Sequence, residues 1–171
     1  MKRYKKSFLT LSILIIIFLS FSFLKTDTAV LGDQDRKFTI NGNSMQSMFL
    51  NNEEVFVDEN YYKENVIKRN DIVLLRHSAN ENFLIKIVKA TDEDFLEIKD
   101  VNLLINGKLM KNSEDQTYSF QTNELKMLGL YIKDGYLPKE TVFVFGDNIS
   151  DSKDSRNFGA VPENYILYKV N

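Results

Sequence analysis

Several residue types that commonly carry chemistry are missing or rare in this sequence of 171 residues. Cysteine is absent, which excludes disulfides, thiolate nucleophiles and cysteine-ligated zinc together. Histidine occurs once, at His77, so no histidine cluster supports a catalytic zinc, and a Ser/His/Asp triad would have to use this residue. His77 lies in the polar stretch RHSANEN, which we predict to be an exposed loop. None of the seven glycines belongs to a glycine-rich phosphate loop, and DNISDSKDS lacks the alternation of an EF-hand calcium loop.

Charge is distributed unevenly along the chain. Lys2, Arg3, Lys5 and Lys6 place four positive charges and no acid in the first six residues. The remainder carries 18 basic against 24 acidic side chains, a net charge of −6. Because such a domain repels phosphate backbones, we expect no nucleic-acid partner.

An uncharged run of 18 residues, SFLTLSILIIIFLSFSFL, extends from Ser7 to Leu24 and is followed by Lys25. It is long enough to span a hydrocarbon core of ~30 Å. We interpret residues 1–6 as a cytoplasmic tail and 7–24 as a transmembrane anchor. The alternative is a cleavable signal peptide, but the run exceeds the usual ~7–15 residues and TDTAVLGD offers no clear cleavage site. Basic residues before the span and acidic ones after it place the bulk of the chain outside the cell membrane.

The residues after the span predict a stalk and a β-rich domain. Residues 25–37 are polar and patternless, as in a stalk. Eight later segments have strand-like length and are rich in Val, Ile, Phe and Tyr. They are KFTI, EEVFV, DIVLL, FLIKIV, FLEIK, NLLI, TVFVF and YILYKV. The pair Asn106-Gly107 lies between two apolar runs and predicts a hairpin.

These patterns define a fold class. Segments 59–68 and 122–131 each suit a helical turn, and the rest of the chain favours strands. We predict a mainly β domain over residues 38–171, built on an antiparallel sheet, with a small β insertion at about 92–137.

Lys86 is unusual for a strand residue. Its neighbours Ile85, Ile87, Leu84 and Val88 make both faces of the strand apolar, as in a strand buried on both sides. Burial would lower the pKa of the lysine from ~10.4 and allow it to act as a general base near neutral pH. The alternative is that the aliphatic stem packs and the ammonium reaches water.

Two further segments are polar. INGNSMQSMF (40–49) contains Ser44, which could be an ordinary turn residue, and FGDNISDSKDSRNFGAVP (145–162) could be an ordinary surface loop.

Taken in order and spacing, these segments resemble the conserved boxes of type I signal peptidases, in the short form of Gram-positive bacteria, over nearly the whole chain. Gly42-Asn43-Ser44-Met45 resembles the nucleophile motif, which maps Ser44 onto the nucleophile. RNDIVLL resembles the Gly-Asp-Ile-Val strand, with Asn70 in the glycine position, and LIKIV maps Lys86 onto the lysine general base. The closing box aligns Gly146, Asp147, Asn148, Ser152, Asp154, Ser155, Arg156 and Gly159. The hairpin LLINGKLM also resembles the one preceding that box.

The chain departs from the family pattern near the proposed dyad. Ser47-Met48 stands where the family usually has Pro-Thr, and Ile87 replaces an arginine after the lysine. KATDED lacks the Gly-Asp that commonly follows, and Ile149 replaces an arginine in the closing box. These changes bear on substrate handling and leave the dyad residues in place.

The resemblance implies a mechanism without metal or cofactor. Neutral Lys86 takes the proton of Ser44, which attacks the scissile carbonyl to form an acyl-enzyme. Ser152 would hydrogen-bond the Lys86 amine, and Asp154 and Arg156 would pair to hold the closing loop. The Ser44 N–H would bind the oxyanion, without the side-chain hydroxyl that some members carry at the position of Gly42.

The resemblance also implies the partners. The substrates would be signal peptides of exported preproteins, docked as extended strands. Their small side chains would enter shallow pockets formed by Phe38, Ile40, Met45, Phe49, Leu84 and Ile85, although each could be ordinary core. We expect a monomer held in the lipid bilayer. The alternative is a signal-peptidase-like assembly factor or chaperone for surface proteins or pili, without essential proteolysis. A soluble self-cleaving regulator, like the SOS-response repressors, would lack the membrane span.

Overall fold

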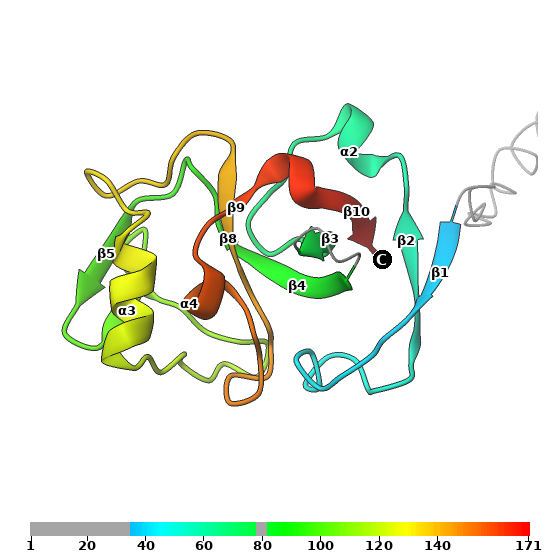
Figure 1. Ribbon diagram of the computed structural model, residues 1–171, viewed down its shortest axis with the longest axis horizontal. Helices are drawn as coiled ribbons and strands as arrows, with labels where there is room; N and C mark the ends of the chain where they lie inside the picture. Colours follow the sequence, from blue (N-terminus) through cyan, green and yellow to red (C-terminus); the bar gives the residue numbers. More distant parts are fainter. Residues whose placement is uncertain (1–34, 78–81) are drawn as a thin grey trace, which may run out of the picture. The chain divides into compact units, whose positions relative to one another are not determined.

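The computed structural model describes residues 35–77 and 82–171 (Figure 1). The predicted tail, the anchor at 7–24 and most of the stalk lie outside these residues. Within the described ranges, no helix has the length and apolar character needed to cross a membrane.

Strands dominate the described residues. In chain order the elements are β1 (Asp35–Thr39), β2 (Glu54–Asp58), α2 (Tyr61–Glu64), β3 (Ile72–His77), β4 (Asn82–Ala90), β5 (Leu96–Lys99), β6 (Asn102–Ile105), β7 (Lys108–Leu109), α3 (Thr122–Gly129), β8 (Thr141–Phe145), α4 (Ser155–Phe158), β9 (Val161–Pro162), the 3₁₀ helix η1 (Glu163–Tyr165) and β10 (Ile166–Val170).

The larger sheet has seven antiparallel strands in the order β1-β2-β10-β3-β4-β8-β9. Strand β2, which lies between β1 and β10, alternates, with Val55 and Val57 buried and Phe56 exposed, as expected for a strand with one face on the core. The inner strand β8 is buried over four consecutive residues, because both of its faces are covered. Strands β3 and β4 are neighbours in the middle of this sheet.

The smaller sheet has three strands in the order β5-β6-β7, with α3 beside it (Figure 1). Its β6–β7 hairpin turns at Asn106 and Gly107, whose φ angles of 50° and 75° match the turn predicted for this dipeptide. Leu125 and Leu128 of α3 join a core cluster that also contains Phe145 of β8. This cluster connects the smaller sheet to the larger one.

The predicted fold class, a mainly β domain with an antiparallel sheet, is confirmed. Two details differ. β1 begins at Asp35, so the last three residues of the predicted stalk are strand residues, paired with β2. His77 is the last residue of β3 and is paired with Asn82 of β4 instead of lying in a loop. The β3–β4 ladder therefore extends into the polar stretch RHSANEN.

Candidate active site

The loop after β1 carries Ser44 in a series of tight turns. Gly42 opens it with a φ of 110°, a conformation that L side chains rarely adopt. The next turns are closed by hydrogen bonds from Gln46 N to Asn43 O (3.0 Å) and from Met48 N to Met45 O (2.8 Å). The Met45 side chain is almost fully buried, which fixes the loop to the core directly beside Ser44.

Lys86 extends from the centre of β4 and meets Ser44. Its Nζ lies 2.6 Å from Ser44 Oγ and donates a second hydrogen bond to Ile85 O at 3.0 Å. The residue is only 2 % exposed. The alternative in which the ammonium reaches water is therefore wrong for this lysine, because its amine ends at a serine hydroxyl inside the protein.

Burial lowers the pKa of Lys86. Loss of hydration disfavours the ammonium and is the largest effect, while the Asp154 carboxylate favours it and the Arg156 guanidinium opposes it; together they bring the pKa to about 8. Because the two neighbouring charges act in opposite directions, desolvation decides the result. A minor but accessible fraction of Lys86 is then a neutral amine near pH 7, and this form can act as a general base.

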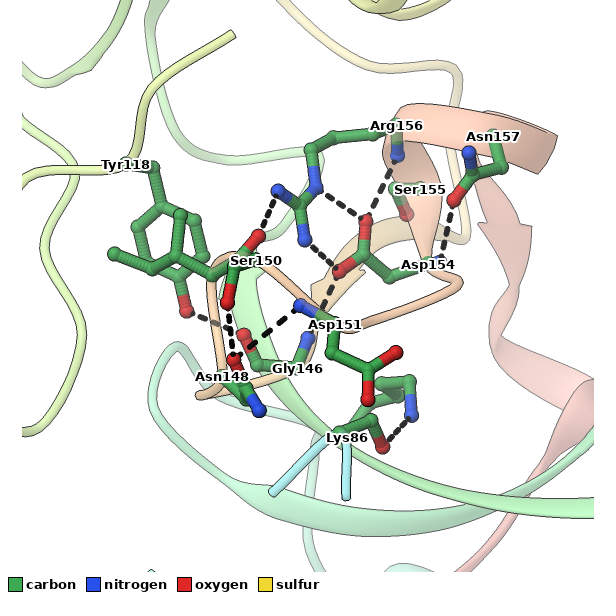
Figure 2. A network of polar contacts seen from close by, with 12 residues as sticks. Lys86, Tyr118, Gly146, Asn148, Ser150, Asp151, Asp154, Ser155, Arg156 and Asn157 are labelled. Carbon is green, nitrogen blue, oxygen red and sulfur yellow. Dashed lines mark hydrogen bonds and ion pairs between the residues drawn. The ribbon is translucent and has the colours of Figure 1, made fainter. Parts of the chain in front are cut away.

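The closing loop between β8 and α4 is held by a buried ion pair. Arg156 Nε and Nη2 donate to the two carboxylate oxygens of Asp154, each at 2.9 Å, in a bidentate arrangement (Figure 2). The same carboxylate accepts hydrogen bonds from Gly146 N and from Arg156 N, which caps α4. Arg156 Nη1 also donates to Ile149 O at 2.6 Å. One ion pair thus joins both ends of the loop.

The closing loop also contacts the serine loop directly. Asn148 N donates to Ser44 O at 3.0 Å, and Asn148 Nδ2 donates to Asn43 O at 3.1 Å. Gly146 permits this approach, since a Cβ there would lie 2.5 Å from Ser44 O and 2.1 Å from Ser152 Oγ. These contacts hold the backbone of the serine loop through Asn148, which lies 105 positions after Asn43 in the chain.

The Ser152 hydrogen bond predicted from the family resemblance is not formed. The Ser152 Oγ is buried and has no hydrogen-bond partner among the described residues. The Lys86 amine bonds Ser44 Oγ and the carbonyl of Ile85 instead.

An open pocket of about 280 Å³ lies against the dyad and is bounded by β1, the serine loop and β4. Of the predicted pocket residues, Phe38, Ile40, Met45, Leu84 and Ile85 line it. Phe49 does not, and packs instead against the core cluster of β2 and β10. The pocket is also lined by Thr39, Asn41, Leu74 and Phe83, which no sequence pattern predicted. Phe83 precedes Leu84 on β4 and packs edge-on against Phe38, with ring centroids 6.0 Å apart.

Two residues of the family boxes have a contact or a backbone conformation that the sequence alone did not predict. Asp147 is fully buried and accepts hydrogen bonds from Ser113 N and Ser113 Oγ, which lie 34 positions earlier in the chain. Asn70, in the family's glycine position, has a φ of 70°. Asparagine tolerates that left-handed conformation better than most residues, which explains why it replaces glycine here. Within the described ranges, no group of three or more acidic, cysteine or histidine residues could hold a metal ion.

Comparison with known proteins identifies the family of this chain. The family described as signal peptidase, peptidase S26, matches residues 2–171. Signal peptidase IB of Staphylococcus aureus is 29% identical over 144 residues, covering 78% of this chain and 74% of the relative. Signal peptidase I P of Bacillus subtilis subsp. natto is 32% identical over 128 residues, or 70% of this chain and 65% of the relative. This chain therefore belongs to the signal peptidase family, peptidase S26.

A solved structure is also similar. The crystal structure of a signal peptidase I from Enterococcus faecalis V583 matches with a TM-score of 0.48 and 22% identity. The match covers 63% of this chain and 98% of the solved one.

Proposed function

We propose that this protein is a membrane-bound serine endopeptidase that removes signal peptides from exported preproteins by a Ser44–Lys86 dyad. The observation that carries the proposal is the 2.6 Å contact between Lys86 Nζ and Ser44 Oγ. Membership of the signal peptidase family supports the reaction class. The family resemblance supports the assignment of these two residues.

The first chemical step is proton transfer from Ser44 to the neutral amine of Lys86. The serine oxygen attacks the scissile carbonyl, and the resulting oxyanion is bound by the Ser44 N–H. This N–H is available because it donates no hydrogen bond to any group in the described residues. Lys86 then passes the proton to the leaving amine of the mature protein. In the second half, neutral Lys86 accepts a proton from water, whose oxygen attacks the acyl carbonyl. The bond from that carbonyl to Ser44 Oγ then breaks, and Lys86 returns the proton to Ser44 Oγ, which restores both groups.

Three residues support these steps without reacting. Asn148 fixes the carbonyls of Asn43 and Ser44, so that the serine loop keeps its orientation during attack. The Asp154–Arg156 pair holds the closing loop that carries Asn148, and its charges act on the Lys86 amine in opposite directions.

The pocket beside the dyad suits small side chains. Ile40 and Met45 are buried in its wall, and Phe38 and Phe83 lie at its side. An extended signal peptide would place its residues before the cleavage site here, with the small side chains directed into the apolar wall. The oxyanion site has no added hydroxyl at Gly42, where the φ of 110° disfavours a side chain.

We also propose the arrangement in the cell. Residues 7–24 anchor the chain in the bilayer, residues 1–6 remain cytoplasmic, and residues 38–171 form an extracytoplasmic catalytic domain with an insertion at about 92–137. The basic residues before the span support this orientation. An anchor of this kind would confine the monomeric enzyme to the surface in which its membrane-embedded substrates lie.

A second candidate function is that of an assembly factor on the same fold. It is favoured by one observation, the Ser152 hydroxyl that makes no hydrogen bond beside the dyad. In that case Ser44 and Lys86 would be a buried polar pair without essential turnover.

The direct test uses the full chain in neutral detergent with a synthetic preprotein peptide that has an Ala-x-Ala cleavage sequence. The proposal expects cleavage after the second alanine and none by Ser44→Ala. Cleavage that persists in Ser44→Ala preparations would reveal a contaminant. Absence of cleavage, together with failure of a small serine-directed acylating agent to label Ser44, would overturn the proposal.

A further inference from the structure

A second pocket, of about 240 Å³, shares no lining residue with the pocket beside the dyad. It lies where β4 meets the β6–β7 hairpin. Its charged lining consists of four cations, Arg69, Lys89, Lys108 and Lys111, and no acidic residue lines it. Such a concentration is unexpected in a chain whose acidic residues outnumber its basic ones. We propose that this pocket binds a small phosphate-bearing anion.

Lys89 is the central element of this site. It occupies the β-bulge at which the register of β4 with β8 shifts between Val88 and Ala90. A bulge leaves one residue outside the ladder and re-aims its side chain. Lys89 is only 7 % exposed, and its Nζ donates one hydrogen bond, to Lys111 O at 2.8 Å. The remaining donors of this ammonium have no hydrogen-bond partner among the described residues.

The surroundings of Lys89 leave its charge incompletely compensated. The Asp147 carboxylate favours the ammonium but is held by Ser113, and it forms no ion pair with Lys89 within the described ranges. The Tyr118 ring lies 5.8 Å from Nζ. Burial lowers the pKa of Lys89, despite the opposing effect of Asp147. An anion in the pocket would stabilise the buried ammonium and use its free donors.

The other three cations of the pocket differ in their ionic partners. Arg69 is fixed by Asp94 at 3.0 Å, and Lys111 pairs with the exposed carboxylate of Asp115 at 2.8 Å. Lys108 is exposed and has no ionic partner in the described part of the chain. Guanidinium and ammonium groups from three segments thus line one pocket, and together they offer the several donors that the oxygens of a phosphate group accept.

The size and the apolar lining restrict the ligand further. The volume is below the ~300–1,000 Å³ of clefts that take drug-sized molecules, so the ligand is small. Leu109 and Met110 add apolar wall beside the cations. Free phosphate and the phosphodiester headgroup of an anionic lipid both meet these requirements.

The experiment is lysine footprinting on the full chain in neutral detergent. An amine-acetylating reagent is applied with increasing inorganic phosphate at constant ionic strength, and the acetylation of each lysine is measured by mass spectrometry. We expect saturable protection of Lys108 and Lys111, and none of Lys99, an exposed lysine at the far end of the β5–β6 hairpin. Equal protection of Lys99, or no saturable protection of Lys108 by any source, would overturn the proposal.

Variants and vesicles complete the test. Lys89→Met should abolish the phosphate-dependent protection of Lys108, and labelling of Ser44 by an acylating agent reports whether this variant is folded. If Lys89→Met does not fold, the test uses Lys108→Gln, with phosphate binding measured by the shift in melting temperature. Lys108→Gln should weaken phosphate binding at least fivefold, and Lys99→Gln should leave it unchanged. The same footprinting is repeated with lipid vesicles. If phosphatidylglycerol vesicles protect Lys108, and phosphatidylcholine vesicles and free phosphate do not, the anion is a lipid headgroup. Unchanged phosphate binding in Lys108→Gln and in folded Lys89→Met would overturn the site.

Discussion

Lys86 and Lys89 stand three residues apart on β4, and both are buried, yet their amines meet different groups. Lys86 is 2 % exposed and contacts the hydroxyl of Ser44, whereas Lys89 is 7 % exposed and contacts the backbone carbonyl of Lys111. Burial lowers the pKa of both. Desolvation alone therefore does not distinguish a general base from a buried cation. The group that the amine contacts makes this distinction.

The backbone causes this difference. Lys86 lies in regular ladder, opposite Val73 of β3, whereas Lys89 occupies the bulge against β8. The bulge directs Lys89 toward the smaller sheet and the Asp147 side of the closing loop. β4 thus supplies two buried lysines to two different pockets.

The largest expected effect is the loss of cleavage when either dyad residue is removed. Ser44→Ala and Lys86→Met should each lower kcat/KM at least about a thousandfold, and the double variant should be no worse, because the two residues act as one unit. Peptide cleavage by the full chain measures this, with circular dichroism to confirm folding. Lys99→Gln, at an exposed position on β5, is the control and should cleave normally. Substantial turnover by either single variant would reassign the catalytic group.

The next effect concerns the close approach of the closing loop. Gly146→Ala would bring a Cβ within 2.5 Å of Ser44 O, so the two loops must separate. We expect cleavage to fall on the order of a hundredfold, as for other displacements of reacting groups by about 1 Å. Gly129→Ala in α3 is the matched control, because its Cβ would lie 3.6 Å from Ile98 Cδ1, an ordinary contact. Equal activity of the two variants would show that the loop contact does not position Ser44.

Stability should respond to Lys86 in the opposite direction to activity. The pKa of Lys86 falls from 10.5 to about 8 on folding, so its charge destabilises the folded state by up to about 3 kcal/mol. This cost is fully present below pH 8 and disappears as the pH rises to about 10.5. Lys86→Met should therefore raise the melting temperature at pH 7, and the gain should shrink above pH 8. Lys89→Met should give a smaller gain, because Lys89 is less deeply buried than Lys86 and loses less hydration on folding.

Calorimetry across pH 6 to 10.5 measures this difference. A melting temperature that falls in Lys86→Met at pH 7 would mean that the lysine contributes more through its contacts than its burial costs. The same pKa predicts that kcat/KM of the wild type rises through about pH 8, as the neutral amine is formed. A profile already flat at pH 6 would contradict the assignment of Lys86 as the base.

How far the sequence predicted this site depends on the range of each interaction. Strand periodicity and the Asn106-Gly107 turn predicted the mainly β fold, because these signals are local. The apolar neighbours of Lys86 indicated a buried lysine, while its pairing with Ser44 came from the family resemblance. The contacts of Asn148 with the serine loop and of Asp147 with Ser113 join residues far apart in the chain, and no local pattern predicts them. Phe49 was misplaced because an apolar residue near a pocket and one in the core look alike in sequence.

The smallest expected effect is on substrate choice, from substitution of Ser47 and Met48. This substitution also distinguishes the enzyme from the assembly factor. Ser47 and Met48 are exposed, where the family usually has Pro-Thr. The Ser47 N–H donates to no described group, whereas Met48 N donates to Met45 O, so the double change to Pro-Thr keeps this hydrogen bond. Proline would restrict the backbone after the nucleophile, and threonine would remove an exposed thioether.

We expect the Pro-Thr variant to cleave a wider range of preprotein peptides, with changes of a few fold in kcat/KM for each. Its rate of reaction with a small serine-directed acylating agent should equal that of the wild type, because Ser44 and Lys86 are untouched. Altered acylation would mean that positions 47 and 48 act on the dyad itself and not on substrate choice. The assembly factor makes the opposite prediction, since neither chain would cleave any preprotein and Ser44→Ala would restore growth or surface assembly in cells lacking the native protein. Such complementation would show that the biological role does not depend on Ser44 chemistry, whatever the proximity of the two side chains.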